Sequence, residues 1–297
     1  MKRDLGNVFV IAQKEFADNL YSMRFLALLS IVTLIIFSMS YRNVTEGRNV
    51  FETGFLDVAQ IIGLFLPLLG IALGFDTIVK ERKSGSLNVL LTHPIFRDNI
   101  ITGKIIGYLA TLALVVGIAV IASVGTMLFG TGVQVSLFQL ERILIFTILT
   151  FLYISIFVGI GIFLSIVSKS ASNSLIYGIA IWLNVVVAFG AIIAVIASMI
   201  TGQPFLDFDN PTLELNAKMQ KFTPLHHYAE TVSGVPSFSW GGITVFSNKL
   251  SRGIFDTGNS LDKWIQEYWS NLIVLITLPI VLFISSFVAF LRKDITL

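Results

Sequence analysis

Six long apolar stretches alternate with shorter polar segments along the chain. They cover residues 25–41, 58–79, 105–130, 143–168, 172–200 and 270–291. An α-helix needs roughly 20 mostly apolar residues to cross a bilayer, and each stretch is near or above that length. The first stretch ends without a small-residue cleavage pattern, so we expect a retained span and not a signal peptide. The pattern predicts an all-α polytopic membrane protein with six transmembrane helices in a single domain, residues 1–297.

The lengths and connections of these stretches predict further details. Only Lys169, Ser170 and their neighbours separate the fourth and fifth stretches, which predicts a tight helical hairpin. The third and fifth stretches are longer than a bilayer requires, so we expect them to be tilted or broken. Gly159 and Gly161 would suit a close helix contact, but generic packing between membrane helices is the better explanation for them.

A separate amphipathic pattern covers residues 8–23, just before the first span. Phe9, Ala12, Phe16 and Leu20 recur at spacings of three and four, and polar residues fill the other face. We expect an interfacial helix that lies in the inner headgroup layer with this apolar face on the lipid. A short soluble helix in the cytoplasm is the alternative, and the position next to the first span favours the interfacial helix.

The segment 201–268, before the last span, is the only long part outside the apolar stretches. It is rich in Gly, Pro, Asn and Ser, so we expect short helices and loops packed over the outer mouth of the bundle. His226 and His227 are candidate metal ligands, with Glu230 four residues after the first of them. Adjacent helical residues point about 100° apart, so two neighbouring histidines seldom share one ion. We therefore expect no metal site on this exposed segment.

Basic residues are divided unequally between the two ends of the spans. Twelve Lys or Arg lie near span ends on the side of the N-terminus, against three on the short loops opposite. The side richer in basic residues is normally cytoplasmic, so both termini of this multi-pass protein are expected on the cytoplasmic side of the cell membrane. Trp264, Tyr268 and Trp269 stand where the last span would leave the bilayer, which predicts an aromatic anchor at its outer end.

Composition agrees with a membrane protein and excludes several kinds of site. Hydrophobic residues make up 55% of the chain and charged residues 13%, against about 25% charged in soluble proteins. The net charge of +2 gives no indication of a nucleic-acid partner. The chain has no cysteine, which excludes disulfides, thiolate metal sites and a cysteine nucleophile.

The usual motifs of catalysis and of ion-driven transport are also absent from the sequence. It contains no phosphate-binding loop, no zinc-binding helix and no nucleophile elbow. Asp76 is the one acid inside a predicted span, and an ion pair with Lys80 at the helix end explains it more simply than a proton relay. We therefore expect no cofactor, no metal and no enzymatic activity, and we expect the energy for transport to come from another chain.

The loop after the second span carries the most specific pattern. Ser84-Gly85-Ser86 interrupts the helix, because Gly permits a reversal and Ser can cap a new helix. An apolar stripe at helical spacing follows, then a helix stop, then a basic residue leading back to the membrane: Leu87, Leu90 and Leu91, then Pro94, then Arg97. The pattern predicts a short amphipathic helix on the cytoplasmic face. It could dock in a groove of a partner protein or lie on lipid, and periodicity alone does not separate the two.

The same loop resembles the motif of type-2 ABC exporter permeases, the ABC-2 type. The residues that carry the resemblance are Glu81, Gly85, Ser86, Leu87, Leu90, Leu91 and Pro94, with Ser86 in place of the commoner Thr. Three further segments are similar to the family: the run from Ile11 to Asp18, the pair Gly103-Lys104, and the stretch from Pro224 to Tyr228. Within the family, the chain most resembles the permeases of multicopper-enzyme and nitrous oxide reductase maturation systems. Nothing in the residues themselves supports copper passage.

The resemblance implies a permease subunit, in most such systems an exporter, that works with a separate ATPase and a second permease half. Gly85, Ser86 and the residues to Arg97 would dock on the ATPase, and Glu81 would fix the docking through charge pairs at its rim. Two other functions stay open: a non-transporting membrane anchor of a larger complex, and a membrane-embedded enzyme. A membrane enzyme would need facing acid–base residues in the spans, and the sequence offers no such pair.

Overall fold

The computed structural model describes residues 2–47, 55–86, 96–132, 135–203, 211–238 and 253–293. Within these ranges the chain is helical and contains no strand. The elements are α1 (Lys2–Leu20), α2 (Met23–Thr45), α3 (Phe55–Gly74), α4 (Val79–Ser84), α6 (Arg97–Thr131), α7 (Leu137–Val167), α8 (Ala171–Trp182), the π-helix η2 (Leu183–Ala188), α9 (Phe189–Thr201), α10 (Pro211–Gln220), α11 (Pro224–Ser233) and α12 (Leu261–Arg292).

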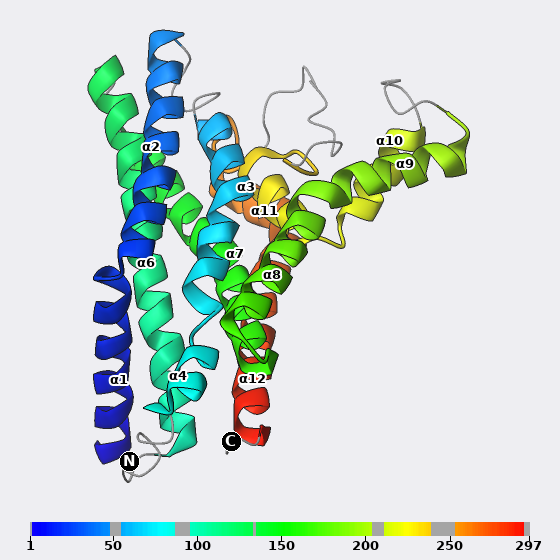
Figure 1. Cartoon of the computed structure of the whole chain (residues 1–297). Helices are drawn as coiled ribbons and strands as arrows, with labels where there is room; N and C mark the ends of the chain where they lie inside the picture. The colour runs from blue at the N-terminus through cyan, green and yellow to red at the C-terminus, as the bar shows by residue number, and fades with distance from the viewer. Residues whose placement is uncertain are drawn as a thin grey trace.

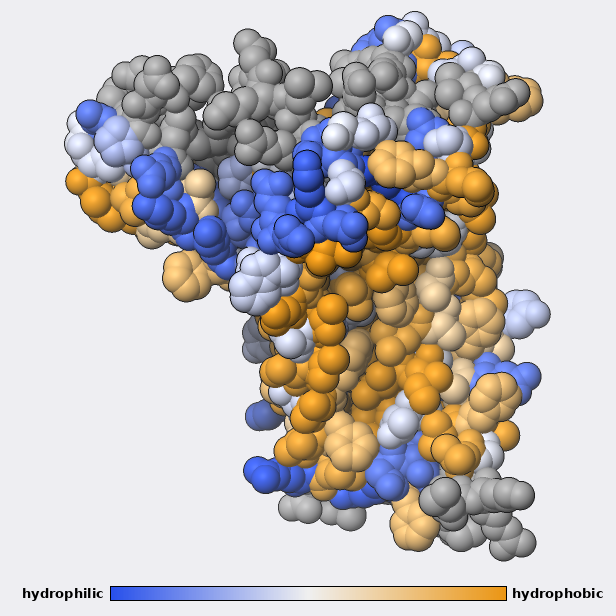
Figure 2. Space-filling view, turned by 180° about the vertical axis from the view of Figure 1, so that it is seen from behind, coloured by the Kyte–Doolittle hydropathy of each residue, from blue (hydrophilic) through white to orange (hydrophobic). Residues whose placement is uncertain are grey.

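In the part of the chain that the structure describes, six helical segments are long and apolar enough to cross a membrane, which confirms the predicted fold class. They are formed by α2, by α3 with α4, by α6, by α7, by α8 to α9 and by α12, and they are 23 to 35 residues long. Figure 1 shows that the two ends of the chain lie at the same end of the bundle. Figure 2 shows apolar side chains covering the middle of the molecule, with polar side chains gathered above and below. We call the end that carries α4 and both termini the loop end, and the other the opposite end.

The second span is broken near the loop end. Helix α3 ends at Gly74, residues 75–78 form a turn, and α4 begins at Val79. A Cβ atom added to Gly74 would lie 2.7 Å from the backbone nitrogen of Ile162 and 2.8 Å from the carbonyl oxygen of Val158, both in α7. Only glycine permits this approach, and Gly161 of α7 faces the same contact, which is closer than the generic packing favoured from the sequence. The fifth span is interrupted as well, by η2, whereas α6 runs unbroken for 35 residues.

Helix α1 runs alongside the loop-end half of α6 and does not cross the ends of the spans (Figure 1). It is longer than predicted at its start and ends before Met23. The face that packs on α6 includes Ala12 and Glu15, while Phe9 remains 70% exposed. Phe16 and Leu20 are half-buried. The predicted apolar face is therefore divided between a protein contact and an open surface.

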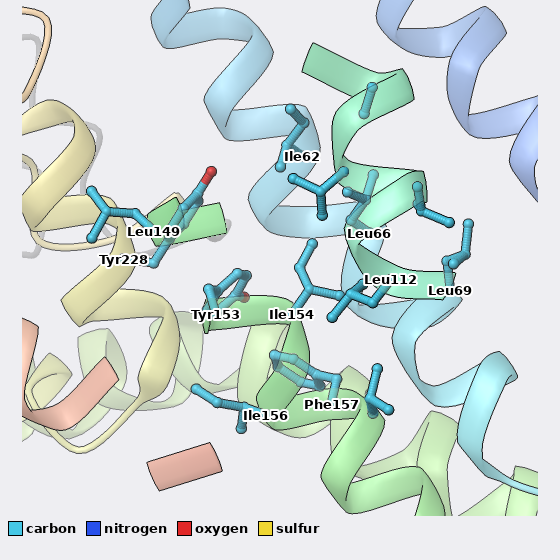
Figure 3. Packing of buried hydrophobic residues seen from close by; sticks show 14 of the residues in the cluster. Ile62, Leu66, Leu69, Leu112, Leu149, Tyr153, Ile154, Ile156, Phe157 and Tyr228 are labelled. Carbon is cyan, nitrogen blue, oxygen red and sulfur yellow. The ribbon is translucent and has the colours of Figure 1, made fainter. Parts of the chain in front are cut away.

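Helix α11 inserts among the spans at the opposite end. Its Tyr228 is fully buried and stacks on Tyr153 of α7, with ring centroids 4.5 Å apart (Figure 3). The hydroxyl group of Tyr153 donates to the carbonyl oxygen of Gly63, 2.9 Å away in α3, and Thr150 lies 3.0 Å from the hydroxyl group of Tyr228. The segment before the last span is therefore part of the core and does not only cover the mouth of the bundle.

Candidate functional site

The most highly charged internal site lies at the loop end, where α1, α4 and α6 meet. Lys104 of α6 is only 1% exposed, and its ammonium group donates to Glu15 Oε1 of α1 at 2.7 Å and to Glu81 Oε1 of α4 at 2.8 Å. Burying an ammonium ion costs several kcal/mol unless close counter-charges and hydrogen bonds offset the loss of water. The two carboxylates supply both. We call Lys104, Glu15 and Glu81 the buried ion cluster.

Two glycines on α6 bring α1 close enough to form this cluster. A Cβ on Gly107 would lie 2.7 Å from the Cβ of Glu15 and 2.8 Å from the carbonyl oxygen of Ala12. A Cβ on Gly103 would meet Ile11 at 2.8 Å. Small residues four apart let two helix backbones approach, so α1 fits over the position from which the Lys104 side chain leaves α6. The two segments Ile11–Asp18 and Gly103-Lys104, separate in the sequence, thus form one contact.

Helix α4 is anchored to α7 on its other side. Ser165 Oγ accepts hydrogen bonds from the backbone nitrogens of Ile78 at 2.9 Å and Val79 at 3.1 Å, which satisfies amides that a helix start leaves unpaired. Arg82 donates to the carbonyl oxygens of Ile166, at 3.3 Å, and of Ser168. A cation at the C-terminal end of α7 also complements the negative end of the helix dipole. The loop that follows α4 therefore begins from an element fixed on two sides.

Asp76 has a different partner from the one predicted. Its Oδ2 accepts from Arg24 Nη2 at 3.0 Å, so the ion pair joins the turn before α4 to the start of α2 and does not involve Lys80. The guanidinium group of Arg24 also lies over the ring of Phe75, 4.8 Å from its centroid. The prediction failed because Lys80 is a neighbour in sequence, whereas the turn at 75–78 directs Asp76 toward α2.

A polar cleft of about 240 Å³ opens beside the buried ion cluster, between α1 and α4. Lys14 lines it together with Asp18, Arg24 and Lys80. Burial alone would lower the pKa of Lys14, but the charges of Glu15, Glu81 and Asp18 together raise it above its usual value. Positive and negative groups alternate around the cleft, so it is not a site of one charge sign.

The predicted docking residues are only partly within the described chain. Gly85 ends α4 with a φ of +73°, the left-handed conformation expected where the chain reverses. The hydroxyl group of Ser86 donates back to the carbonyl oxygen of Glu81 at 3.3 Å. Arg97 begins α6 and donates to the carbonyl oxygen of Leu291 at 3.5 Å. Leu87, Leu90, Leu91 and Pro94 lie outside the described residues.

At the opposite end, the histidine pair is buried and not exposed as expected. His226 Nδ1 lies 2.7 Å from the carbonyl oxygen of Pro236, and its Nε2 lies 3.1 Å from Glu230 Oε2. His227 Nδ1 lies 2.7 Å from Asn271 Oδ1 in α12, and Asn271 Nδ2 donates to Glu230 Oε2 at 2.7 Å. The described residues hold no group of three or more His, Asp or Glu side chains arranged for a metal ion. The pair belongs to a polar contact between α11 and α12.

The protonation states of His227 and Glu230 in this contact are set by burial and by neighbouring groups. Burial lowers the pKa of His227 below its ordinary value, and the hydrogen bond with Asn271 only partly opposes this effect. Burial opposes ionisation of Glu230, but His226, Asn271 and Lys221 together outweigh it and lower the pKa of that carboxyl. The folded state therefore favours an unprotonated His227 and an ionised Glu230.

The predicted aromatic anchor is only partly exposed. Trp269 is 59% exposed, but Trp264 and Tyr268 are buried, and the indole nitrogen of Trp264 donates to the carbonyl oxygen of Thr231 at 3.0 Å. Arg142, which sequence reasoning counted only as a basic loop residue, is 1% exposed and donates to the carbonyl oxygens of Ile254 and Asn259. Its neighbours in the sequence give no signal of that role.

A family model matches most of the chain, and two known proteins match more than a third of it. A family model described as ABC-2 family transporter protein matches residues 9–295. The chain is 32% identical over 111 residues to the probable ABC transporter permease protein NosY of Pseudomonas aeruginosa, a stretch that covers 36% of this chain. It is 28% identical over 116 residues, 38% of this chain, to the protein of the same name from Stutzerimonas stutzeri. The matched stretches cover 40% and 42% of the two relatives.

Six apolar helices with an internal charge cluster beside one loop define a polytopic membrane protein whose polar machinery lies at the end of the bundle. The family match completes the assignment. The chain belongs to the ABC-2 family of transporter proteins. Permeases of this family are not themselves enzymes. They generally act as dimers with an ATPase partner.

Proposed function

We propose that the segment following α4 docks on a separate ATPase subunit and that the chain exports its substrate. The observation that carries this proposal is the anchoring of α4. Ser165 and Arg82 join it to α7, and Glu81 joins it to Lys104 of α6. A displacement of the loop would therefore reach two spans and α1 at once. In this proposal Glu81 fixes the position of α4 through its ion pair with Lys104, and it does not form a charge pair with the ATPase.

Closure of the ATPases on ATP would push the loop helix, and α4 would pass the movement to α6 and α7. Helix α11, held between α3, α7 and α12, lies where the outer gate would open. The loop end would face the cytoplasm of the cell, as the distribution of Lys and Arg indicates, and α11 would face outward. The second half of the transporter would be another copy of this chain or a paralogue of it.

The exposed surface of α1 supports its proposed contact with the inner headgroup layer. Leu5, Phe9 and Val10 are largely exposed and apolar, while Ala12 is covered by α6. Polar Lys14 and Asp18 lie on the side that lines the cleft. An exposed apolar face beside charged residues is the arrangement that binds lipid surfaces. Phe16 and Leu20 would contribute at the edge of this face.

The proposal is tested by co-purification of the chain with candidate ATPase subunits. Wild type should retain one ATPase in a stable complex, and Leu87→Asp/Leu91→Asp should lose it, because two charges in an apolar docking stripe cannot be desolvated without cost. Phe129→Asp/Leu137→Asp is the matched control, since both residues are exposed and apolar at the opposite end. Equal ATPase binding by the loop variant and wild type would contradict the docking assignment and favour the membrane anchor.

A further inference from the structure

The buried ion cluster links three elements that the chain sequence keeps apart. Glu15 and Lys104 are 89 residues apart, and Glu81 and Lys104 are 23 apart. Lys104 is the fully buried cation among the residues that line the loop-end cleft, whereas Arg24 is half exposed and Lys14 more so. A single ammonium group thus holds a carboxylate from α1 and a carboxylate from α4 at hydrogen-bond distance.

The two ion pairs of the cluster, Glu15–Lys104 and Glu81–Lys104, differ in how much other packing stabilises them. Glu15 sits on a helix that packs on α6 through Gly103 and Gly107, so the α1–α6 contact also has backbone packing to stabilise it. Glu81 lies on a six-residue helix that follows a four-residue turn. Its Oε1 is held by Lys104, and its buried Oε2 has no hydrogen-bond partner among the described residues. The hold of α6 on α4 therefore depends strongly on one charged contact.

We propose that Lys104 is the positioning residue that makes α1, α4 and the start of α6 move as one body when the loop after α4 is displaced. This inference rests on the proposed docking of an ATPase to that loop. Without the contact, a push on the loop would bend the turn at 75–78 and leave α6 and α1 behind. With it, the movement reaches α6, because separating an ion pair inside a protein requires leaving a charge uncompensated. The role is mechanical: Lys104 contacts neither the substrate nor the nucleotide.

The absence of native cysteines makes this movement measurable. Gln13→Cys on α1 and Lys83→Cys on α4 place spin labels at exposed positions on the two sides of the cluster. Their distance is measured by pulsed electron resonance in the permease–ATPase complex, first without nucleotide and then with ATP and vanadate. In wild type the distance should be the same in both states, with fewer than about one complex in ten deviating.

Glu81→Gln is the informative variant, because it removes the α4 carboxylate from the buried ion cluster and leaves the Glu15–Lys104 pair in place. In this variant, the distance between the two spin labels without nucleotide should match that of wild type. With ATP and vanadate, the distance should change in more than about half of the complexes, which is a roughly tenfold shift in the equilibrium between the joined and separated arrangements of α1 and α4. A merely stabilising contact would not produce a change that depends on nucleotide. Asp18→Asn, which removes an exposed acid of α1 that pairs with Lys14 at 3.5 Å, is the matched control and should behave as wild type.

Two results would overturn the inference: a nucleotide-dependent distance change in wild type, or an unchanged distance in Glu81→Gln. If Glu81→Gln yields no complex, Glu81→Asp, whose side chain is one methylene shorter and draws the carboxylate away from Lys104, is judged by the same criterion. Failure of the proposed docking is recognised separately, because wild type would then not retain an ATPase during purification.

Discussion

The two ends of the bundle bury polar groups in different ways. At the loop end, full charges from three elements converge in the buried ion cluster. At the opposite end, α11 is held by stacked rings, such as Tyr228 on Tyr153, and by hydrogen bonds in which the ionised Glu230 takes part beside neutral partners. Removing one member of a buried ion group costs several kcal/mol, whereas one neutral hydrogen bond contributes about 1 kcal/mol. The comparison indicates a loop end that moves as a unit and an opposite end that can separate in small steps, as an outer gate would.

The largest expected effect comes from removing the central charge of the loop end. Lys104→Met leaves Glu15 and Glu81 facing each other in a buried site, and should lower the free energy of unfolding by about 3–5 kcal/mol. The measurement is reversible unfolding in mixed detergent micelles. Lys218→Met, which breaks an exposed pair with Glu214 on α10, should cost far less, because solvent screens that pair. Similar losses for the two variants would contradict the assigned role of burial at the loop end.

An intermediate loss of stability is expected from glycine-to-alanine substitutions. The loss should be larger where the glycine packs against backbone, near the loop end, than where it packs against side chains, at the opposite end. Gly74→Ala places a Cβ against backbone atoms of α7 that cannot give way, so the free energy of unfolding should fall by about 1–3 kcal/mol. Gly63→Ala meets ring atoms of Phe238 at 3.0 Å and Tyr228 at 3.1 Å, which can shift, so its loss should be smaller. Gly117→Ala, with no atom within 4 Å, should be neutral or slightly stabilising. A larger loss for Gly63→Ala would reverse the ranking.

The smallest effect is the response of the opposite end to pH. The pKa of His227 and that of Glu230 are both lowered in the folded state, so the unfolded chain binds more protons and stability falls as pH falls. The loss from His227 begins as pH drops through the ordinary value of 6.5, and that from Glu230 begins only near 4.5. Between pH 7.5 and 5.5, His227→Gln should therefore show a shallower decline of Tm than wild type.

A matched control keeps this last test specific to the buried histidine. Glu214→Gln changes an exposed acid on α10, where the pKa is lowered by its hydrogen bond and charge interaction with Lys218. That carboxyl titrates below the pH range of the test, so its Tm profile should run parallel to wild type. A parallel profile for His227→Gln as well would show that the pH response arises elsewhere in the chain.

Much of the architecture follows from the sequence alone. Apolar runs predicted all six spans, and the reversal at Gly85 was predicted because glycine enters the left-handed conformation without strain. The interruption of the fifth span agrees with the tilt or break expected from its length, whereas the close contact at Gly161 was the less favoured of two interpretations. These features depend on local composition and periodicity, which a single sequence displays directly.

The candidate site depended on contacts that no local pattern reports. Glu15 lies on the polar side of the α1 pattern and reads as a solvated charge, yet α6 covers it. Asp76 pairs with Arg24, 52 residues away, and not with Lys80 one helical turn away. Periodicity describes which face of a helix is apolar, but the partner of a charge is set by which helices approach and how closely. That approach was decided in the tertiary structure, where glycines on α6 let the α1 backbone come close and enclose Lys104.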